Sequence, residues 1–154
     1  MRFVFNDGGR SKAGFKGVAG DCVCRAITIA ENRPYKEIYD ELNELGKSER
    51  LGKRKKGKSS ARNGVYRNTL KKYLKALGWT WVPTMFIGSG CRVHLREDEL
   101  PKGTIIVSLS RHIATVKDGV LHDLGDCSRD GTRCVYGYWI KEEKKNENVF
   151  RRTK

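Results

Sequence analysis

The chain has 154 residues, 38% of them apolar, and a formal net charge of +14. This length fits one domain whose core needs no disulfide bonds, and the apolar content excludes a fully disordered chain. No apolar run approaches the roughly 18 residues of a membrane-spanning helix, so we expect no contact with a membrane. Asn6-Asp7-Gly8-Gly9 directly follows the short apolar opening, which leaves no signal-peptide core, and we therefore expect a cytoplasmic protein.

The first half of the chain is expected to hold one short strand and three helices. Arg2–Phe5 has the composition of a strand and is ended by a glycine turn. Asp21 is a suitable N-cap for a helix from Cys22 to about Glu31, because apolar residues recur there at helical spacing. Pro34 suits the first position of a second helix. That helix ends near residue 46, and a third covers about residues 68–77.

The second half changes to the alternating pattern of β-strands, separated by proline, glycine and a polar segment. The expected strands are 79–82, 84–87, 104–109, 112–117, 120–124 and 136–140. Helices followed by antiparallel strands predict an α+β domain. We expect this single domain to span residues 1–140 and a charged tail to span residues 141–154. Trp79, Trp81 and Trp139 are expected in the core or in the walls of a cleft.

The positive charge is concentrated in one loop and in the tail. Residues 47–62 contain eight basic residues and one acidic residue, and the segment 53–60 within them has no apolar side chain to bury, so we expect a mobile loop. One interpretation is a solvated loop that aids solubility. The other is a binding site for nucleic acid or an acidic protein. That site would consist of Lys53, Arg54, Lys55, Lys56 and Lys58.

Five cysteines in a cytoplasmic chain do not favour disulfide bonds. Structural zinc is an alternative, because Cys91 and His94 have a C-x-x-H spacing. Their partners would come from Cys22/Cys24 or Cys127/Cys134, and neither pair has the usual spacing of a zinc knuckle. We therefore expect mostly buried thiols with one reactive among them, no bound metal and no cofactor.

Cys22 is the candidate for the reactive thiol. It opens a helix, where unpaired backbone N–H groups and the helix dipole favour a thiolate. The alternative is that Cys22 is a small buried apolar residue.

A predicted β-hairpin selects the histidine that could serve Cys22. Asp118-Gly119 is typical of a two-residue turn between strands, and this turn places Ala114 opposite Asp123. His112 then lies diagonally from Asp123 on the same face, within hydrogen-bond reach, while His122 points to the other face. A helix-start cysteine and a histidine oriented by an acid form the arrangement that a thiolate nucleophile needs.

Two segments resemble papain-like cysteine peptidases. Gly20–Ile27 is similar to the nucleophile segment of these enzymes, in particular of ovarian-tumour-type deubiquitinases, and His112–Asp123 resembles the histidine hairpin of papain-like and bacteriocin-leader peptidases. The resemblance implies a papain-like fold, with N-terminal helices packed on a C-terminal antiparallel sheet. It further implies that Cys22 is the nucleophile, His112 the general base and acid, and Asp123 the residue that orients the imidazole.

The whole chain also resembles a family of small bacterial and phage proteins, which would place a phage-encoded copy in the host cytoplasm. The matching segments are 7–10, 19–22, 78–79, 88–94 and 134–139. Two positions depart from the peptidase patterns: Lys16 stands where papain-like enzymes usually have the oxyanion-hole Gln, and Ala19 where the deubiquitinases have Asp. The backbone N–H of Cys22 and the side chain of Asn6 are the candidate oxyanion donors.

The sequence thus predicts a cysteine hydrolase that acts on a peptide or protein through a thioester intermediate. It could be a peptidase, an isopeptidase, or an amidase or acyl transferase. The alternative is a catalytically idle papain-like module that docks on nucleic acid or an acidic protein through its basic loop. A zinc-stabilised domain is the third possibility. The sequence makes no prediction of oligomeric state.

Overall fold

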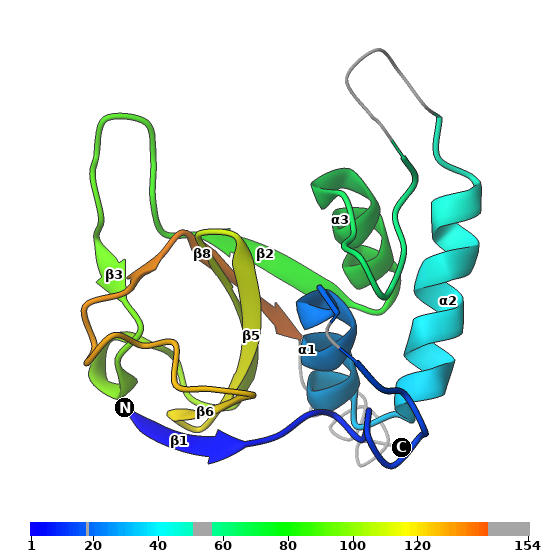
Figure 1. The fold of residues 1–154 in the computed structure, drawn as a ribbon. Helices are drawn as coiled ribbons and strands as arrows, with labels where there is room; N and C mark the ends of the chain where they lie inside the picture. Colours follow the sequence, from blue (N-terminus) through cyan, green and yellow to red (C-terminus); the bar gives the residue numbers. More distant parts are fainter. Residues whose placement is uncertain (18, 51–56, 142–154) are drawn as a thin grey trace, which may run out of the picture.

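The computed structural model describes residues 1–17, 19–50 and 57–141 (Figure 1). The described elements are β1 (Arg2–Phe5), α1 (Cys22–Glu31), α2 (Tyr35–Lys47), α3 (Arg67–Ala76), β2 (Trp79–Pro83), β3 (Val93–His94), β4 (Thr104–Leu109), β5 (His112–Lys117), β6 (Val120–Asp123), β7 (Cys134–Val135) and β8 (Gly137–Lys141), with a 3-10 turn at Glu97–Glu99. The predicted α+β class is confirmed. Among the described residues, no helix has the length and apolar character needed to cross a membrane.

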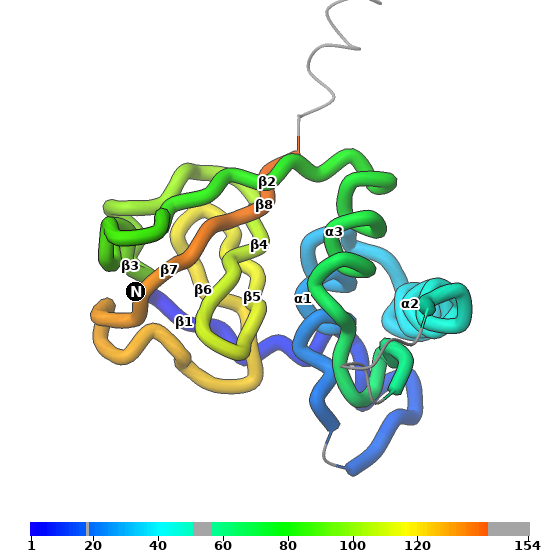
Figure 2. The backbone as a smooth tube through the Cα atoms, turned by 90° about the horizontal axis from the view of Figure 1, so that it is seen from above, coloured from blue at the N-terminus to red at the C-terminus, as the bar shows by residue number. Residues whose placement is uncertain are grey.

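The helix α1 is the centre of the molecule, because it lies between the sheet and α2 (Figures 1 and 2). Every residue from Val23 to Ile29 is buried. On the sheet side, the Thr115 hydroxyl of β5 donates a hydrogen bond to the Ala26 carbonyl at 2.6 Å. On the other side, α2 contributes the buried Ile38 and Leu42. This burial fixes the start of α1 relative to β5.

The main sheet has the order β1-β6-β5-β4-β8-β2. Its strands pair antiparallel except for β1, which pairs parallel to β6 with Phe5 opposite Asp123. The expectation of a wholly C-terminal, antiparallel sheet was therefore wrong at this edge, because the N-terminal strand completes it. A separate two-stranded ladder, β3–β7, was not predicted.

The predicted strand at 84–87 is absent, and the segment forms a loop. Met85, Phe86 and Ile87 are all exposed. The Ser89 N–H donates to the Phe86 carbonyl at 3.0 Å, which closes a turn. The apolar side chains there join neither apolar core, so their β-propensity does not produce a strand.

Two apolar cores lie on opposite faces of β4, because side chains alternate along a strand. Ile106 joins the core formed by α1, α2, α3, Trp79 and Trp139. Ile105 and Val107 join the second core, with Val116 and Leu121. Burial on both faces makes the centre of the sheet a rigid support for β5.

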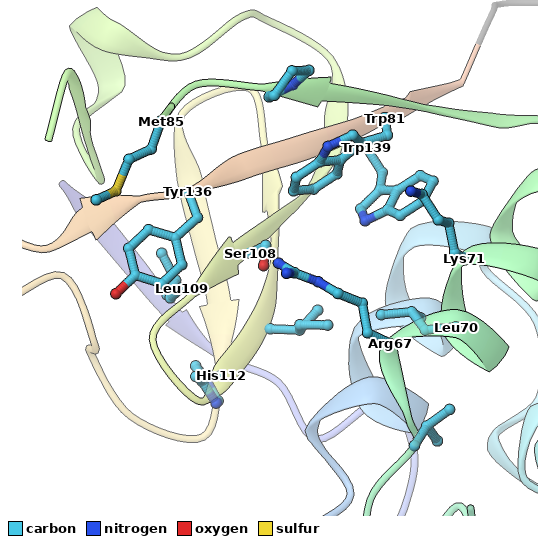
Figure 3. Close-up of a pocket in the computed structure, with 13 residues that line it drawn as sticks. Arg67, Leu70, Lys71, Trp81, Met85, Ser108, Leu109, His112, Tyr136 and Trp139 are labelled. Carbon is cyan, nitrogen blue, oxygen red and sulfur yellow. The ribbon is translucent and has the colours of Figure 1, made fainter. Parts of the chain in front are cut away.

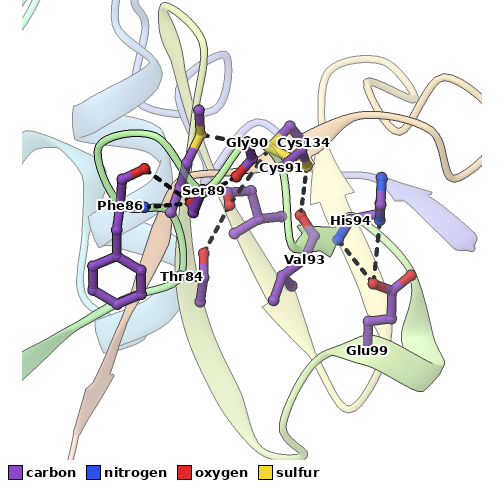
Figure 4. The surroundings of a disulfide bond; sticks show 11 residues. Thr84, Phe86, Ser89, Gly90, Cys91, Val93, His94, Glu99 and Cys134 are labelled. Carbon is purple, nitrogen blue, oxygen red and sulfur yellow. Dashed lines mark hydrogen bonds and ion pairs between the residues drawn. A yellow bond between two sulfur atoms is a disulfide. The ribbon is translucent and has the colours of Figure 1, made fainter.

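Cys91 and Cys134 form a disulfide bond, with 5.8 Å between their Cα atoms (Figure 4). The expectation that the cysteines would remain unpaired is thus wrong for these two. The β3–β7 ladder, in which His94 lies opposite Cys134, brings the two sulfurs together. The His94 ring lies 3.2 Å from Glu99. The zinc site considered for Cys91 and His94 therefore does not form in this structure.

Candidate active site

The β5–β6 hairpin has the predicted register. Lys117 lies opposite Val120 and Thr115 lies opposite His122. Asp118 and Gly119 have φ values of 47° and 79°, the left-handed conformations that a tight hairpin turn requires. A Cβ on Gly119 would also clash with the Glu97 side chain. The turn therefore demands glycine and sets which residues share a face.

His112 and Asp123 form the predicted pair, with 2.5 Å between Nε2 and Oδ2. The Asp123 side chain is only 8% exposed. Its Oδ1 accepts a hydrogen bond from the Leu124 N–H at 2.8 Å and lies 3.4 Å from the Arg25 guanidinium. Burial raises the pKa of Asp123, but the hydrogen bond from His112 and its charge outweigh this and hold the pKa below its usual value. The group stays ionised and orients the imidazole.

The His112 imidazole is strongly biased toward its protonated form. The hydrogen bond to Asp123 is the largest cause, followed by hydrogen bonds to Cys127 and Cys22, and together they raise the pKa of His112 to about 11. Asp123 occupies Nε2, so Nδ1 is the ring nitrogen left to face a thiol. An imidazolium held in this way stabilises a neighbouring thiolate.

Cys22 is the first residue of α1, and its thiol lies close enough to this imidazole for the two groups to interact. Burial raises the pKa of the Cys22 thiol. Hydrogen bonds from the His112 side chain and the Ile113 backbone, with the positive charges of His112 and Arg25, lower it by more, so the net pKa lies below that of an ordinary thiol. The structure thus brings Cys22, His112 and Asp123 together.

Arg25 is a site residue that the sequence analysis missed. Its Nε lies 3.1 Å from Asp21 and its Nη1 lies 3.4 Å from Asp123, and all three side chains are buried. One guanidinium therefore links the start of α1 to the strand that carries Asp123. An arginine four residues after Asp21, on a helix otherwise rich in apolar residues, was the available signal.

Asp21 occupies the predicted N-cap position but makes no capping hydrogen bond. Its carboxylate instead accepts a hydrogen bond from the Tyr35 hydroxyl at 2.7 Å and lies 3.2 Å from Arg10. The residue thus ties the segment before Cys22 to α2, and the unpaired N–H groups at the start of α1 remain available near Cys22.

The structure does not bring the Asn6 side chain to Cys22. Its Nδ2 lies 3.2 Å from His122 Nδ1, and its Oδ1 accepts a hydrogen bond from the Gly8 N–H at 2.9 Å. His122 and Asp123 are consecutive on β6, so their side chains point to opposite faces. Asn6 supports the site through its backbone, whose N–H donates to the Asp123 carbonyl at 2.9 Å.

Two further thiols have different surroundings. Cys24 is fully buried, and burial raises its pKa to about 12, which makes it a poor nucleophile. Cys127 is half-buried and hydrogen-bonds to His112, a contact that the sequence did not indicate. Its sulfur and ligand atoms of His112 and Asp123 lie within 4.8 Å of one another, and a thiolate, an imidazole and a carboxylate suit Zn²⁺. A metal there would occupy the same imidazole that faces Cys22.

Cavities lie on both sides of His112. One, of about 590 Å³, extends from His112 across β8 and β2 to α3 (Figure 3). The other, of about 440 Å³, is lined by His112, Asp123, Cys127 and other polar residues including Arg133. Because His112 lines both, a bound molecule that reached from one cavity to the other would pass the imidazole.

The predicted basic site is described only at Lys58, whose Nζ donates a hydrogen bond to the Lys47 carbonyl at 2.9 Å. Lys53, Arg54, Lys55 and Lys56 lie outside the described residues, as does the tail after residue 141. Docking on nucleic acid or an acidic protein through this loop stays a prediction.

Comparison of the chain with protein-family models, with curated proteins and with solved structures finds no match.

Proposed function

We propose that the protein is a cysteine hydrolase with a Cys22-His112-Asp123 triad, in accord with the papain-like motifs of its sequence. The observation that carries the proposal is that one imidazole hydrogen-bonds to a buried carboxylate and also interacts with the thiol at the start of α1. A structural histidine needs only one such partner, whereas the three-group chain is the arrangement of an activated nucleophile.

The reaction proposed is acyl transfer through a thioester. The Cys22 thiolate attacks the carbonyl carbon of an amide, and the backbone N–H groups at the start of α1 stabilise the oxyanion that forms. The C–N bond breaks as protonated His112 gives its proton to the departing amine. Neutral His112 then takes a proton from water, whose oxygen attacks the thioester and releases the acid and the Cys22 thiolate.

The experiment is acylation by p-nitrophenyl acetate, a small ester that tests the nucleophile without requiring the natural substrate. The wild type should release a burst of nitrophenol equal to the enzyme concentration, with the acetyl group found on the peptide that contains Cys22. Cys22→Ala should lose the burst, while the matched variant Cys127→Ala should keep it. A burst that survives Cys22→Ala, or an acetyl group on another cysteine, would contradict the proposal.

A further inference from the structure

The larger cavity, which His112 lines, has an aromatic wall. The rings of Trp81 and Trp139 lie 5.1 Å apart between centroids, and both line the cavity, as does Tyr136 (Figure 3). Trp81 lies against Gly137, where any side chain would clash with the indole. Because β2 and β8 hold both indoles in the sheet, this wall is preformed, and such a surface favours a large apolar side chain.

The opposite wall of the same cavity carries positive charge. Arg67 and Lys71 lie one turn apart on α3, and Figure 3 shows the Arg67 side chain projecting from α3 into the cavity. Some cations of the described residues pair with an acidic side chain, for example Arg25 with Asp21 and Lys36 with Asp40. Within the described chain, Arg67 and Lys71 have no such partner, and no acidic residue lines this cavity. The electrostatic complement of this wall is a carboxylate.

The position of His112 indicates what kind of molecule carries these groups. His112 lines the aromatic cavity and also the polar cavity beside Asp123 and Arg133. A ligand that uses both must continue on both sides of the imidazole, as an extended chain does and a small acid does not. A peptide also supplies the amide that the proposed chemistry cleaves.

We propose that the substrate is an acidic peptide segment, in which a large apolar side chain lies against Trp81 and Trp139 while a neighbouring Asp or Glu pairs with Arg67 and Lys71. The inference rests on the hydrolase function proposed above. It adds a preference for negative charge next to an apolar residue, on one side of the cleaved bond.

The test uses Cys22→Ala protein, which binds without turnover, and blocked octapeptides that differ only in having Glu, Gln or Lys beside a central Phe. Binding is followed by calorimetry. The Glu peptide should bind at least about tenfold more tightly than the Lys peptide, because a charge-assisted hydrogen bond contributes that much. Adding Arg67→Glu and Lys71→Glu should reverse this order. The matched control Lys72→Glu, an exposed residue of the same helix outside the cavity, should leave it unchanged.

Equal binding of the three peptides would overturn the inference, and so would a Lys72→Glu variant whose peptide binding changes as much as that of Lys71→Glu. Displacement of the Glu peptide by octanoate at equal concentration would also overturn it, because the site would then select an apolar acid rather than a peptide chain. Near-ultraviolet circular dichroism verifies that each variant is folded. Acylation of Cys22 by p-nitrophenyl acetate separates the two proposals. If acylation is normal and the peptides bind equally, only the substrate class is wrong, whereas selective binding without acylation contradicts the hydrolase.

Discussion

Replacing His112 by alanine should abolish the special reactivity of Cys22 and leave the rest of the protein folded. The substitution removes the hydrogen bond and the positive charge of the imidazolium from the thiol. It leaves the burial that raises the pKa of Cys22, opposed only by the Ile113 backbone hydrogen bond and the charge of Arg25. The Cys22 thiol of the variant should therefore have a higher pKa than in the wild type.

The size of the effect follows from ionisation and nucleophilicity. An ordinary thiol with a pKa of about 8.5 is only about 1% ionised at pH 6.5, so full ionisation increases the thiolate concentration by at most about 100-fold. A more acidic thiolate is a weaker nucleophile, with a Brønsted coefficient of about 0.4–0.5, which cancels roughly half of that gain on a logarithmic scale. Alkylation of wild-type Cys22 at pH 6.5 should thus be faster than that of an ordinary thiol, by up to about tenfold, and the variant should lose this advantage.

The assay is alkylation by iodoacetamide over a range of pH, with each free cysteine quantified by peptide mass spectrometry. Cys24, buried and with a raised pKa, is an internal control that should stay slow in both proteins. The urea-unfolded chain gives the rate of an ordinary thiol. The reasoning is refuted if Cys22 reacts equally fast with and without His112, or if wild-type Cys22 reacts no faster than in the unfolded chain.

Three further predictions concern the acid, the turn and the second thiol. In Asp123→Asn, the pKa of His112 should fall from about 11 toward its ordinary value of 6.5. A histidine whose pKa is raised by folding stabilises the folded state fully at a pH below its pKa in the unfolded chain, and this stabilisation is lost as the pH rises to its pKa in the folded protein. The melting temperature should therefore fall between pH 7 and 11 in the wild type and vary less in the variant. Gly119→Ala places alanine at a φ of 79° and should lower the free energy of unfolding, measured by urea titration, by about 1–2 kcal/mol. The control Gly125→Ala should lower it little, because φ is not positive there and no atom lies within 4 Å of the added Cβ. Zn²⁺ bound to the His112 imidazole should protect Cys22, the proposed nucleophile, from alkylation, and EDTA should restore the reaction. Cys127→Ser should raise the zinc concentration required for protection by about tenfold or more. Equal protection in the wild type and the variant would show that the ion binds elsewhere.

The parts of the site that lie close in sequence could be predicted. The Asp118-Gly119 turn and the two-residue period of its strands fix the register, and the register alone selects His112 over His122. The start of α1 at Cys22 was likewise predicted, because the apolar spacing and Asp21 both mark it. Local patterns carry this information since each depends on residues within one helix or hairpin.

The parts that depend on contacts between distant segments could not be predicted. The parallel pairing of β1 with β6 joins residues more than 100 positions apart, and the Cys91–Cys134 disulfide depends on the β3–β7 ladder. Neither strand of that ladder has more than two residues, so no periodicity marks it. The contact of Cys127 with His112 arises from a loop path that composition does not specify.

The Asp118-Gly119 turn also has a consequence for how the protein ages. In such a dipeptide the glycine nitrogen can attack the aspartate carboxyl carbon, and the succinimide that forms opens to isoaspartate, which adds one carbon to the main chain. In the folded protein the Gly103 N–H holds the Asp118 carboxylate at 2.7 Å, and the Asp118 N–H donates to the Gly103 carbonyl at 3.0 Å, so the attack is restrained. Unfolded chains lack that restraint. Because the turn sets the position of Asp123 relative to His112, stored protein should lose the proposed activity in proportion to its isoaspartate content, although the damaged bond lies outside the candidate site.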